Sequence, residues 1–444
     1  MNIKYHFIAS CFVLSGGLAM LTGCNSPQNL KEFTVENPLD INREDEALVL
    51  TRAQLKPTDK LLKPVITNEQ GEYIPCQLDD LDGDGEWDEL AFVYTFSPSE
   101  KTRLKVEWLT PEKYPVFTPR TNVRYGKMTS PGIIEELSRD AHDKHNLPRG
   151  SEMYPYQMDG PVWENDKMGF RQYFDGRNCC DVFGKRISEM VLDTVGISPE
   201  GHPANTYQVV REWGCDILSA ANSFGLGGLA MQTPDSLVRM GVPASYTEDV
   251  IDSTYYKLVT EGAVRSIIRL TYKGWQIENN KIDLCEEISI WAGKYGYEKR
   301  ISTTTLPGNY FLVTGIVNNL NTQPFTEEEY EGKQHAMLTH DKQTVNGSFY
   351  FGMSLLVPVD NLIETFHTPE ENADIIKTWC VKMKPNANGL YNYRAYAAWE
   401  LRDKQFRERE TFINLIAHEA LCINHPIIIC LLYTSPSPRD GLLS

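Results

Sequence analysis

The stretch Ile268-Arg-Leu-Thr-Tyr-Lys273 alternates apolar and polar side chains at every position. Successive side chains of a β-strand point to opposite faces of a sheet, so this alternation predicts a strand with one buried face. The pattern recurs at residues 282–290 and 391–399, and residues 310–317 form a further strand candidate. Half-buried strands of this kind are typical of antiparallel sheets. We therefore predict an all-β protein built from β-sandwiches.

Helical spacing appears near the C-terminal end. Phe412, Ile416 and Ala420 recur at intervals of four within residues 403–422, which predicts a helix, and residues 133–142 are a weaker candidate. Three prolines between residues 110 and 121 separate two β-rich regions, so we place a domain boundary there. The expected architecture is a small N-terminal β-sandwich over residues 24–109 and a much larger β domain over residues 110–429.

Composition limits the possible partners. The chain has 444 residues, of which 41% are hydrophobic and 23% charged, and this suffices for a large core. Lys and Arg total 43 against 60 for Asp and Glu, so the net charge is −17. Such a chain repels a phosphate backbone, and we expect no nucleic acid partner. The 22 Tyr and 8 Trp are typical of strand-rich proteins that stack sugars.

The N-terminal segment carries one cation, Lys4, and an apolar run that ends in Leu21-Thr-Gly-Cys24. It resembles a bacterial lipoprotein signal, in which small residues admit the peptidase and the cysteine thiol accepts the lipid. We expect residues 1–23 to be removed and Cys24 to anchor the chain to the outer membrane of the bacterial envelope, on its periplasmic or surface face. The alternative is an uncleaved buried helix.

The C-terminal segment contains Cys430-Leu-Leu-Tyr-Thr-Ser-Pro-Ser-Pro-Arg-Asp440, which matches one translated frame of a common sequencing adapter. We expect residues 430–444 to lie outside the natural chain, the alternative being a genuine Ser/Pro-rich tail. Seven cysteines remain beside those at 11, 24 and 430, and they show no CxxC or Cys/His ligand spacing. Neither zinc nor a disulfide framework is predicted.

An acidic loop is the sharpest local motif. Asp80-Leu-Asp-Gly-Asp-Gly-Glu-Trp-Asp88 spaces carboxylates at positions one, three, five and nine, with Gly85 at position six. Oxygen ligands at this spacing suit calcium, although Ala91 stands where a helix-flanked calcium loop has glutamate. We expect either a structural calcium ion or a metal-free acidic hairpin. The candidate ligands are Asp80, Asp82, Asp84, Glu86 and Asp88.

Residues 160–185 are the richest candidate for ligand binding. Arg171 and Tyr173 lie on the same side of a predicted strand, and Trp163, Asn165 and Arg177 flank it. Aromatic rings stack on sugar C–H faces and a guanidinium binds a carboxylate with two prongs, so this composition suits an acidic sugar. The alternative is a strand with a solvated charged face.

Two further clusters follow along the chain. Tyr207 and Trp213 precede Asn222, and the glycines after it fit G-x-G-x-x-A, but Pro234 would end the helix that this motif must open. We therefore predict tight turns and no nucleotide cofactor. His340-Asp-Lys342-Gln343 gathers a base, a cation and an amide just before a predicted strand. Such a loop can carry chemistry, or it can be a polar hairpin turn.

Six motifs carry a resemblance to a known family. They are Gln77–Leu90, Gly160-Pro-Val-Trp-Glu-Asn-Asp166, Arg177-Asn178, Trp213-Gly-Cys-Asp216, Gly227-Gly228 and Glu287-Ile-Ser-Ile-Trp291. Together they resemble a lipoprotein family that carries a domain-of-unknown-function label. Members are typical of polysaccharide-utilisation clusters in Gram-negative bacteria, and one is described as a dehydratase of uronate-ended oligosaccharides from the algal polysaccharide ulvan. The resemblance covers most of the mature chain and, by analogy, implies a mutarotase-like β-supersandwich for the large domain.

The resemblance implies a 4,5-dehydration of a terminal uronate, with ulvan or pectin fragments as substrates. Removal of the C5 proton makes a dianionic enolate, so cations must first neutralise the carboxylate. We assign that role to Arg171 or Arg177, the base to His340, and the acid to Tyr173 or Tyr207. The residues expected to hold the sugar are Trp163, Trp213, Asn165, Asn222, Arg177, Lys342 and Gln343.

Two other function classes fit the same residues. A glycan-binding lipoprotein needs the aromatic rings and the arginines but no base. A glycosidase or polysaccharide lyase needs carboxylates at a fixed separation, for which Asp175, Glu212 or Glu287 could serve. The sequence does not set the oligomeric state.

Overall fold

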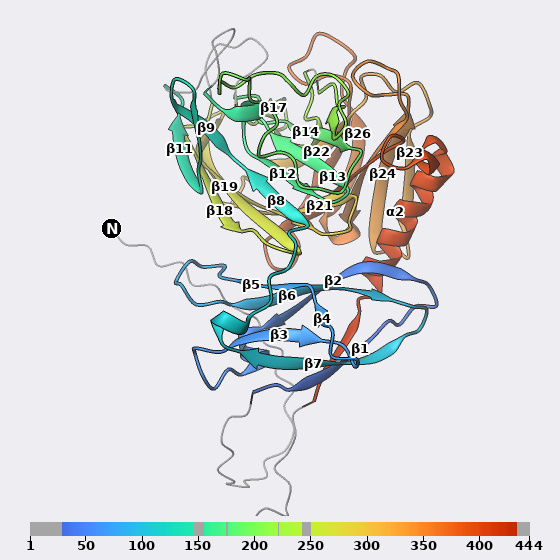
Figure 1. The fold of residues 1–444 in the computed structure, drawn as a ribbon. Coiled ribbons are helices and arrows are strands. Elements are labelled where there is room, and N and C mark those ends of the chain that lie inside the picture. Colours follow the sequence, from blue (N-terminus) through green and yellow to red (C-terminus); the bar gives the residue numbers. More distant parts are fainter. Residues whose placement is uncertain (1–28, 146–154, 175, 221, 242–249, 433–444) are drawn as a thin grey trace, which may run out of the picture.

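The computed structural model describes residues 29–145, 155–174, 176–220, 222–241 and 250–432 (Figure 1). The predicted signal peptide, Cys24, Asp175 and residues 433–444 lie outside these ranges. Strands make up most of the regular structure, and one longer helix, α2 (Arg409–Asn424), lies near the C-terminal end. The prediction of an all-β protein with a C-terminal helix is confirmed. None of the helices in the described ranges has the length and apolar character needed to span a lipid bilayer.

The N-terminal sandwich packs a five-stranded sheet on a three-stranded sheet. In spatial order, the first sheet contains β29 (Ile428–Leu431), β1 (Glu32–Glu36), β7 (Lys101–Leu109), β3 (Lys63–Thr67) and β4 (Tyr73–Ile74). The second contains β2 (Arg43–Thr51), β6 (Glu89–Phe96) and β5 (Cys76–Asp79), and the short α1 (Arg52–Leu55) follows β2. Phe33, Leu50 and Phe92 are among the fully buried core residues.

The strand β29 returns from the far end of the chain to the edge of the N-terminal sandwich. It pairs antiparallel with β1, and Cys430 and Leu431 lie opposite Thr34 and Phe33. Two residues of the segment that resembles an adapter therefore lie in a strand. The pairing ties the chain's end to its first described strand.

The large domain is built around a nine-stranded antiparallel sheet and two five-stranded sheets. The nine strands are, in spatial order, β11 (Arg139–Asp143), β18 (Ser253–Thr260), β19 (Arg265–Ile277), β20 (Asn280–Trp291), β21 (Gly296–Thr303), β28 (Tyr391–Trp399), β25 (Phe351–Pro358), β24 (Gln334–Asp341) and β23 (Thr326–Tyr330). The order follows the chain through β18–β21 because each of these strands pairs with the next.

The two five-stranded sheets and a hairpin complete this domain. One sheet holds β15 (Gly214–Asp216), β14 (Cys180–Lys185), β13 (Met168–Gln172), β12 (Val162–Asn165) and β8 (Thr121–Arg124). The other holds β17 (Leu237–Arg239), β16 (Leu226–Gln232), β22 (Phe311–Val317), β27 (Thr378–Met383) and β26 (Leu362–His367). The hairpin is β9 (Gly126–Ser130) with β10 (Ile133–Glu136), and the 3-10 turns are η1 (Pro111–Lys113), η2 (Gln157–Asp159), η3 (Val359–Asn361) and η4 (Lys404–Arg407).

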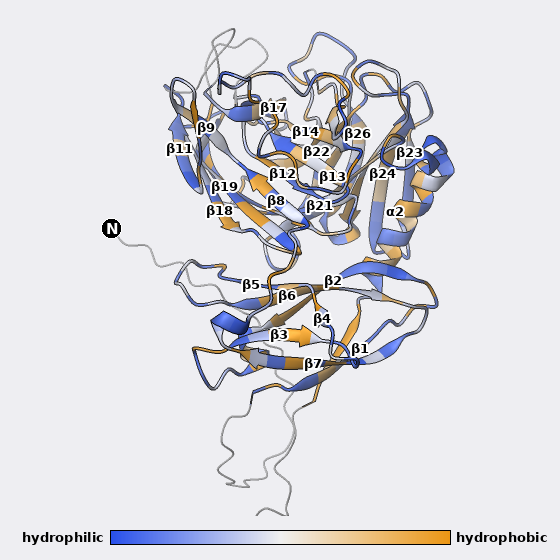
Figure 2. Cartoon of the chain, viewed as in Figure 1, coloured by the Kyte–Doolittle hydropathy of each residue, from blue (hydrophilic) through white to orange (hydrophobic). Residues whose placement is uncertain are grey.

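Local sequence explains most of the longer elements. Along β20, buried and less buried residues alternate without a break from Ile282 onward, as the period-two pattern predicts. The apolar positions of α2 meet Ala336, Leu338 and Leu356 on the outer face of the nine-stranded sheet. Figure 2 shows both hydrophilic and hydrophobic residues along α2. The helix predicted at residues 133–142 is wrong, because β10 and β11 occupy that stretch and pair with β9 and β18.

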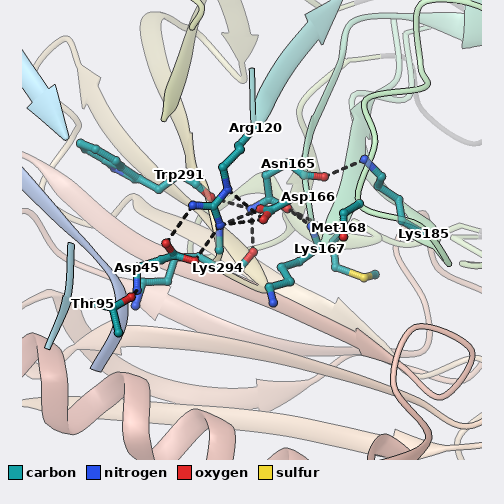
Figure 3. Close-up of polar contacts among 12 residues, drawn as sticks. Asp45, Thr95, Arg120, Asn165, Asp166, Lys167, Met168, Lys185, Trp291 and Lys294 are labelled. Carbon is teal, nitrogen blue, oxygen red and sulfur yellow. Dashed lines mark hydrogen bonds and ion pairs between the residues drawn. The ribbon is translucent and has the colours of Figure 1, made fainter. Parts of the chain in front are cut away.

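Ionic contacts join the two sandwiches. Arg120, which precedes β8, donates to Asp45 Oδ1 at 2.8 Å and Oδ2 at 2.7 Å from the N-terminal side. Its Nη2 also contacts Asp166 Oδ2 of the large domain at 2.7 Å (Figure 3). Nearby, the buried carboxylate of Asp79 pairs with Arg265 of β19. The interface is therefore held by charges drawn from both sandwiches.

Candidate functional site

The candidate site lies on β13 and β14. These strands pair antiparallel, and Arg171 stands opposite Asp181 while Gln172 stands opposite Cys180. Side chains alternate between faces, so Gln172 and Cys180 share the face that meets the nine-stranded sheet, where Lys299 Nζ lies 3.2 Å from Cys180 Sγ. Arg171 and Asp181 therefore project from the opposite, outer face of the five-stranded sheet.

Arg171 is the centre of a buried ionic cluster. Its side chain is 1% exposed, and Nη2 contacts the carboxylates of Asp181 and Asp216, the second at 2.9 Å. Nη1 lies 3.6 Å from Asp159 Oδ2 of η2. The Tyr173 hydroxyl also accepts from Nη2. Three carboxyl groups from three segments thus contact one guanidinium.

Two tyrosine hydroxyls join the cluster. Tyr173 Oη donates to Asp181 Oδ2 at 2.8 Å, and Tyr207 Oη lies 3.2 Å from Asp159 Oδ2. The Arg171 guanidinium also lies 4.1 Å and 5.3 Å from the centroids of the Tyr173 and Tyr207 rings. Burial raises the pKa of both phenols, more than the Arg171 charge lowers it, so both groups stay protonated.

Asp216 is the unusual member of the cluster. Burial, reinforced by the neighbouring Asp181 carboxylate and opposed by Arg171, raises the pKa of Asp216 to about 8. A backbone hydrogen bond from Leu218 also opposes this rise. The side chains of Asp216 and Asp159 are 15% and 24% exposed, so the cluster reaches the surface at these two acids.

The structure brings together three of the four residues predicted to be catalytic, namely Arg171, Tyr173 and Tyr207. Arg177, also predicted from this stretch, is half-buried, and its guanidinium lies 4.0 Å from the centroid of the Tyr173 ring. The prediction that Arg171 itself clamps a substrate carboxylate is wrong. Its guanidinium is buried and already contacts protein carboxylates, so Arg171 holds the cluster in position.

Two predicted sugar contacts are structural. Trp163 is 1% exposed and packs edge-on against Tyr297, with centroids 5.3 Å apart, in the main core. A ring without an open face cannot stack on a sugar, so that prediction is wrong. Asn165 is fully buried, and its Nδ2 donates to the carbonyls of Trp291 and Lys294, both at 2.6 Å. Its predicted contact with sugar hydroxyls is also wrong.

The predicted base does not join the cluster. His340 lies on β24 rather than in a loop, and its Nε2 lies 2.8 Å from the Phe406 carbonyl. The ring stacks near Phe412 of α2, which covers the outer face of the nine-stranded sheet. Burial lowers the pKa of His340. A buried ring on a different sheet cannot reach a substrate at Arg171, so its assignment as the base is wrong.

The neighbours of His340 also serve the fold. Gln343 is buried and its Nε2 donates to the Phe351 carbonyl at 2.7 Å, so its predicted sugar contact is wrong. Lys342 is exposed, and its Nζ lies 5.5 Å from the centroid of the Tyr350 ring, on the His340 side of the domain.

Trp213 and Asn222 precede β15 and β16. Trp213 is half-buried against Phe183, whose ring also contacts Tyr207. Asn222 is exposed in the turn before β16. Of the carboxylates considered for a glycosidase, Glu212 is exposed beside Trp213, and Glu287 lies on β20 and pairs with Arg269 at 2.8 Å.

The acidic loop lies between β5 and β6. Carboxylate oxygens of Asp80, Asp82 and Asp88 lie within 4.8 Å of one another, which suits a single hard cation. The Asp84 carboxylate caps Glu86 N at 2.7 Å, outside this group of three. The Glu86 carboxylate instead pairs with Lys60 at 2.6 Å and with Arg52 at 2.9 Å.

Sequence reasoning missed the three acids of the cluster. Asp181 lies inside the quoted stretch and Asp216 ends a quoted motif, but neither was given a role. Asp159 comes from η2, before the motif Gly160-Pro-Val-Trp. The available signal was an aspartate in the same strand-forming stretch as an arginine, because a buried carboxylate needs a cation or several donors.

Comparison with known proteins places the chain in a family. Residues 35–429 match the family described as "Domain of unknown function (DUF4861)". The chain belongs to this family. The match agrees with the resemblance inferred from the motifs to a family with such a label. A search among curated proteins returns no match.

Solved structures give distant similarities. An α-mannosidase from Enterococcus faecalis V583 aligns over 92% of this chain and 46% of its own, with 8% identity and a TM-score of 0.46. A protein in the glycosyl hydrolase family 38 from Enterococcus faecalis aligns over 92% of this chain and 48% of its own, with 8% identity and a TM-score of 0.46. The gh92 family glycosyl hydrolase ccman5 covers 41% of this chain and 30% of its own, with 10% identity and a TM-score of 0.21. The chain spans about half the length of the two Enterococcus proteins.

Proposed function

We propose that this protein is a carbohydrate-active enzyme that eliminates water from the terminal uronate of acidic oligosaccharides, such as ulvan or pectin fragments. The observation that carries the proposal is the Asp216 carboxyl, whose pKa is raised to about 8 and which reaches the surface beside two protonated phenols. A carboxyl that keeps its proton at neutral pH is a general acid. The family resemblance supplies the substrate class.

The elimination needs a base and an acid on one sugar. The base removes the proton from C5, the electron pair forms the C4–C5 double bond, and the C4–O bond breaks. The acid protonates the departing hydroxyl, so that water leaves. We assign the acid to Asp216 and the base to Asp159, whose carboxylate is the more exposed of the other two. Asp181 is too deeply buried to meet a substrate.

The cations have separate roles. Arg177 is half-buried beside Tyr173 and is the candidate that pairs with the substrate carboxylate, which makes the C5 proton more acidic. Arg171 is a positioning residue, because it holds the carboxylates of Asp181 and Asp216 on one nitrogen. Tyr207 holds the proposed base through its hydroxyl.

A direct assay tests this function. The mature protein is incubated with uronate-ended oligosaccharides, and ultraviolet absorbance reports the conjugated double bond. We expect absorbance to rise when the wild type is present. For Asp216→Asn, the rate of this rise should be lower by about 10²-fold or more. Glu212→Gln, an exposed acid four residues away, is the matched control and should retain activity. Circular dichroism verifies that both variants fold.

Three results would contradict the proposal. If the wild type produces no new absorbance with ulvan, pectin or glycosaminoglycan fragments, the proposed reaction class is wrong. New reducing ends without absorbance would indicate a glycosidase. Full activity of a folded Asp216→Asn variant would remove the cluster from the mechanism.

A further inference from the structure

A cavity lies between the two sandwiches, far from the Arg171 cluster. It has a volume of about 380 Å³ and is bounded by β2 of the N-terminal sandwich, by β20, β21 and β28 of the nine-stranded sheet, and by α2 with the segment that follows it. This volume is within the range of small-molecule sites, about 300–1,000 Å³, and junctions between domains are common places for them.

The cavity and the Arg171 cluster occupy opposite sides of the large sandwich. Arg171 projects from the outer face of its sheet, while its neighbour Gln172 faces inward with Cys180 toward Lys299 of β21. Glu298 precedes Lys299 on β21 and therefore projects outward from the nine-stranded sheet, into the cavity. Two sheets separate the sites, so one ligand cannot occupy both.

Charges in the cavity wall are balanced pair by pair. Lys294 Nζ lies 2.8 Å from Glu46 Oε1 and 3.4 Å from Glu419 Oε1. Arg394 Nη2 lies 2.9 Å from Glu298 Oε2 on the floor of the cavity. Arg43 Nη2 lies 2.5 Å from the other oxygen of Glu46. The wall thus carries three cations and three carboxylates.

Glu46, Glu298 and Lys294 keep their charge at neutral pH. Although burial opposes it, the paired cations lower the pKa of Glu46 and of Glu298. The neighbouring carboxylates raise the pKa of Lys294 against its burial. Because the shifts of these three groups all favour the charged form, acid–base chemistry is not favoured here. The site is therefore suited to binding.

Donors, acceptors and apolar surface alternate around the cavity. The Arg394 side chain is 32% exposed, and Ser289 adds a hydroxyl to the floor. The carboxylates of Glu46 and Glu419 offer further lone pairs. Apolar side chains from β2, α2 and the following segment complete the wall, among them Leu48, Ile423 and Ile427.

We propose that this cavity binds an uncharged polyhydroxylated ligand, such as a neutral mono- or disaccharide. A charged ligand of either sign would compete with an existing ion pair for its partner, which costs desolvation and pairing energy. A neutral sugar leaves every pair intact, because its hydroxyls can donate to the carboxylates and accept from Arg394 and Ser289. Its C–H faces match the apolar wall.

Binding is tested on the full mature chain by isothermal titration calorimetry. The probes are glucose, galactose, xylose, rhamnose and cellobiose, with glucuronate as the charged comparison. We expect at least one neutral sugar to bind, and glucuronate to bind more weakly than its uncharged counterpart glucose. Ala47 is exposed on β2 and lines the cavity, so Ala47→Trp should fill its mouth and weaken binding at least about tenfold.

Matched controls keep the test specific. Glu44→Trp places the same ring on an exposed position of β2 that does not line the cavity, and it should bind as wild type does. Arg394→Leu should weaken binding, whereas Arg300→Leu, which removes the other partner of Glu298 outside the lining, should not. Dehydration activity on acidic oligosaccharides should be unchanged in Ala47→Trp, which separates this site from the catalytic proposal.

Three outcomes would overturn the inference. The first is the absence of a binding signal from the wild type with every neutral sugar at millimolar concentration. The second is undiminished binding by Ala47→Trp, which would place the ligand elsewhere. The third is preferential binding of glucuronate, which would show that the balanced pairs do not select against charge.

Discussion

Removal of the Arg171 guanidinium is the strongest perturbation that the structure suggests. Arg171→Met keeps an unbranched side chain but leaves Asp181, 1% exposed, without its cation. Loss of one partner from a buried ion pair costs about 3–5 kcal/mol of unfolding free energy. Natural domains have only about 5–15 kcal/mol in total, so urea unfolding followed by circular dichroism will detect the change easily.

The loss of unfolding free energy in Arg171→Met should depend on pH, because the variant and the wild type bind protons differently in the folded state. In wild type the pKa of Asp216 is about 8, and without the guanidinium it rises further above its unfolded value. Below about pH 7 the folded variant and the folded wild type both hold this proton, whereas above about pH 8 the folded variant holds it and the folded wild type loses it. Stability of Arg171→Met relative to wild type therefore falls as pH rises from about 7 toward 9, by up to about 1.4 kcal/mol per pH unit for one carboxyl.

Two further variants complete this experiment. Arg171→Met combined with Asp181→Leu replaces the pair by apolar groups and should recover most of the stability. Arg269→Met removes a half-exposed pair with Glu287 and should cost less than about 1 kcal/mol. If Arg171→Met unfolds no more easily than Arg269→Met, or if its deficit is the same at pH 7 and pH 9, then Arg171 is not the buried counter-ion of this cluster.

Other predictions follow from the same geometry. Trp163→Ala should cost about 3–5 kcal/mol of stability in a urea titration, whereas a sugar platform would instead raise KM and barely move the midpoint. If Asp216 is the acid, kcat should fall as pH rises through about 8, because the acid must be protonated; a rate that stays level to pH 9 would contradict it. We propose that calcium binds Asp80, Asp82 and Asp88. After EDTA treatment, added calcium should raise the Tm of wild type and of the control variant Glu44→Gln, but not that of Asp88→Asn. An unchanged wild-type Tm would refute this.

The sequence predicted strands well where one face is buried. In β20, alternate residues are buried, so the period-two pattern is visible in the chain itself. Residues 133–142 lack this alternation because β10 and β11 are short edge strands with few buried residues. Their pairing with β9 and β18 compensates for weak local signals, and the contact between β11 and the distant β18 is not encoded in local spacing.

Side-chain facing could not be predicted for β12, β13 and β14. Every residue of these strands is buried, so there is no alternation from which to distinguish the two faces. Trp163 turned inward to Tyr297 and Arg171 turned outward to the acids, although both looked equally suited to a sugar. The placement of Arg171 and Tyr173 on one side was recoverable because it needs only the strand period. The partners Asp159 and Asp216 arrive from η2 and β15, which only the fold brings near.

The Arg171 cluster and the cavity differ in charge balance. This difference explains why the cluster is suited to proton donation and the cavity to ligand binding. In the cavity three cations face three carboxylates, and the paired cations lower the pKa of Glu46 and of Glu298 against their burial. Around Arg171, three carboxyls contact one guanidinium in a buried setting, and they cannot all ionise without strong mutual repulsion. One of them must retain its proton near neutral pH, and Asp216 is the one whose carboxyl is both raised in pKa and open to the surface. An excess of acids over cations, rather than burial alone, is what makes this cluster able to donate a proton.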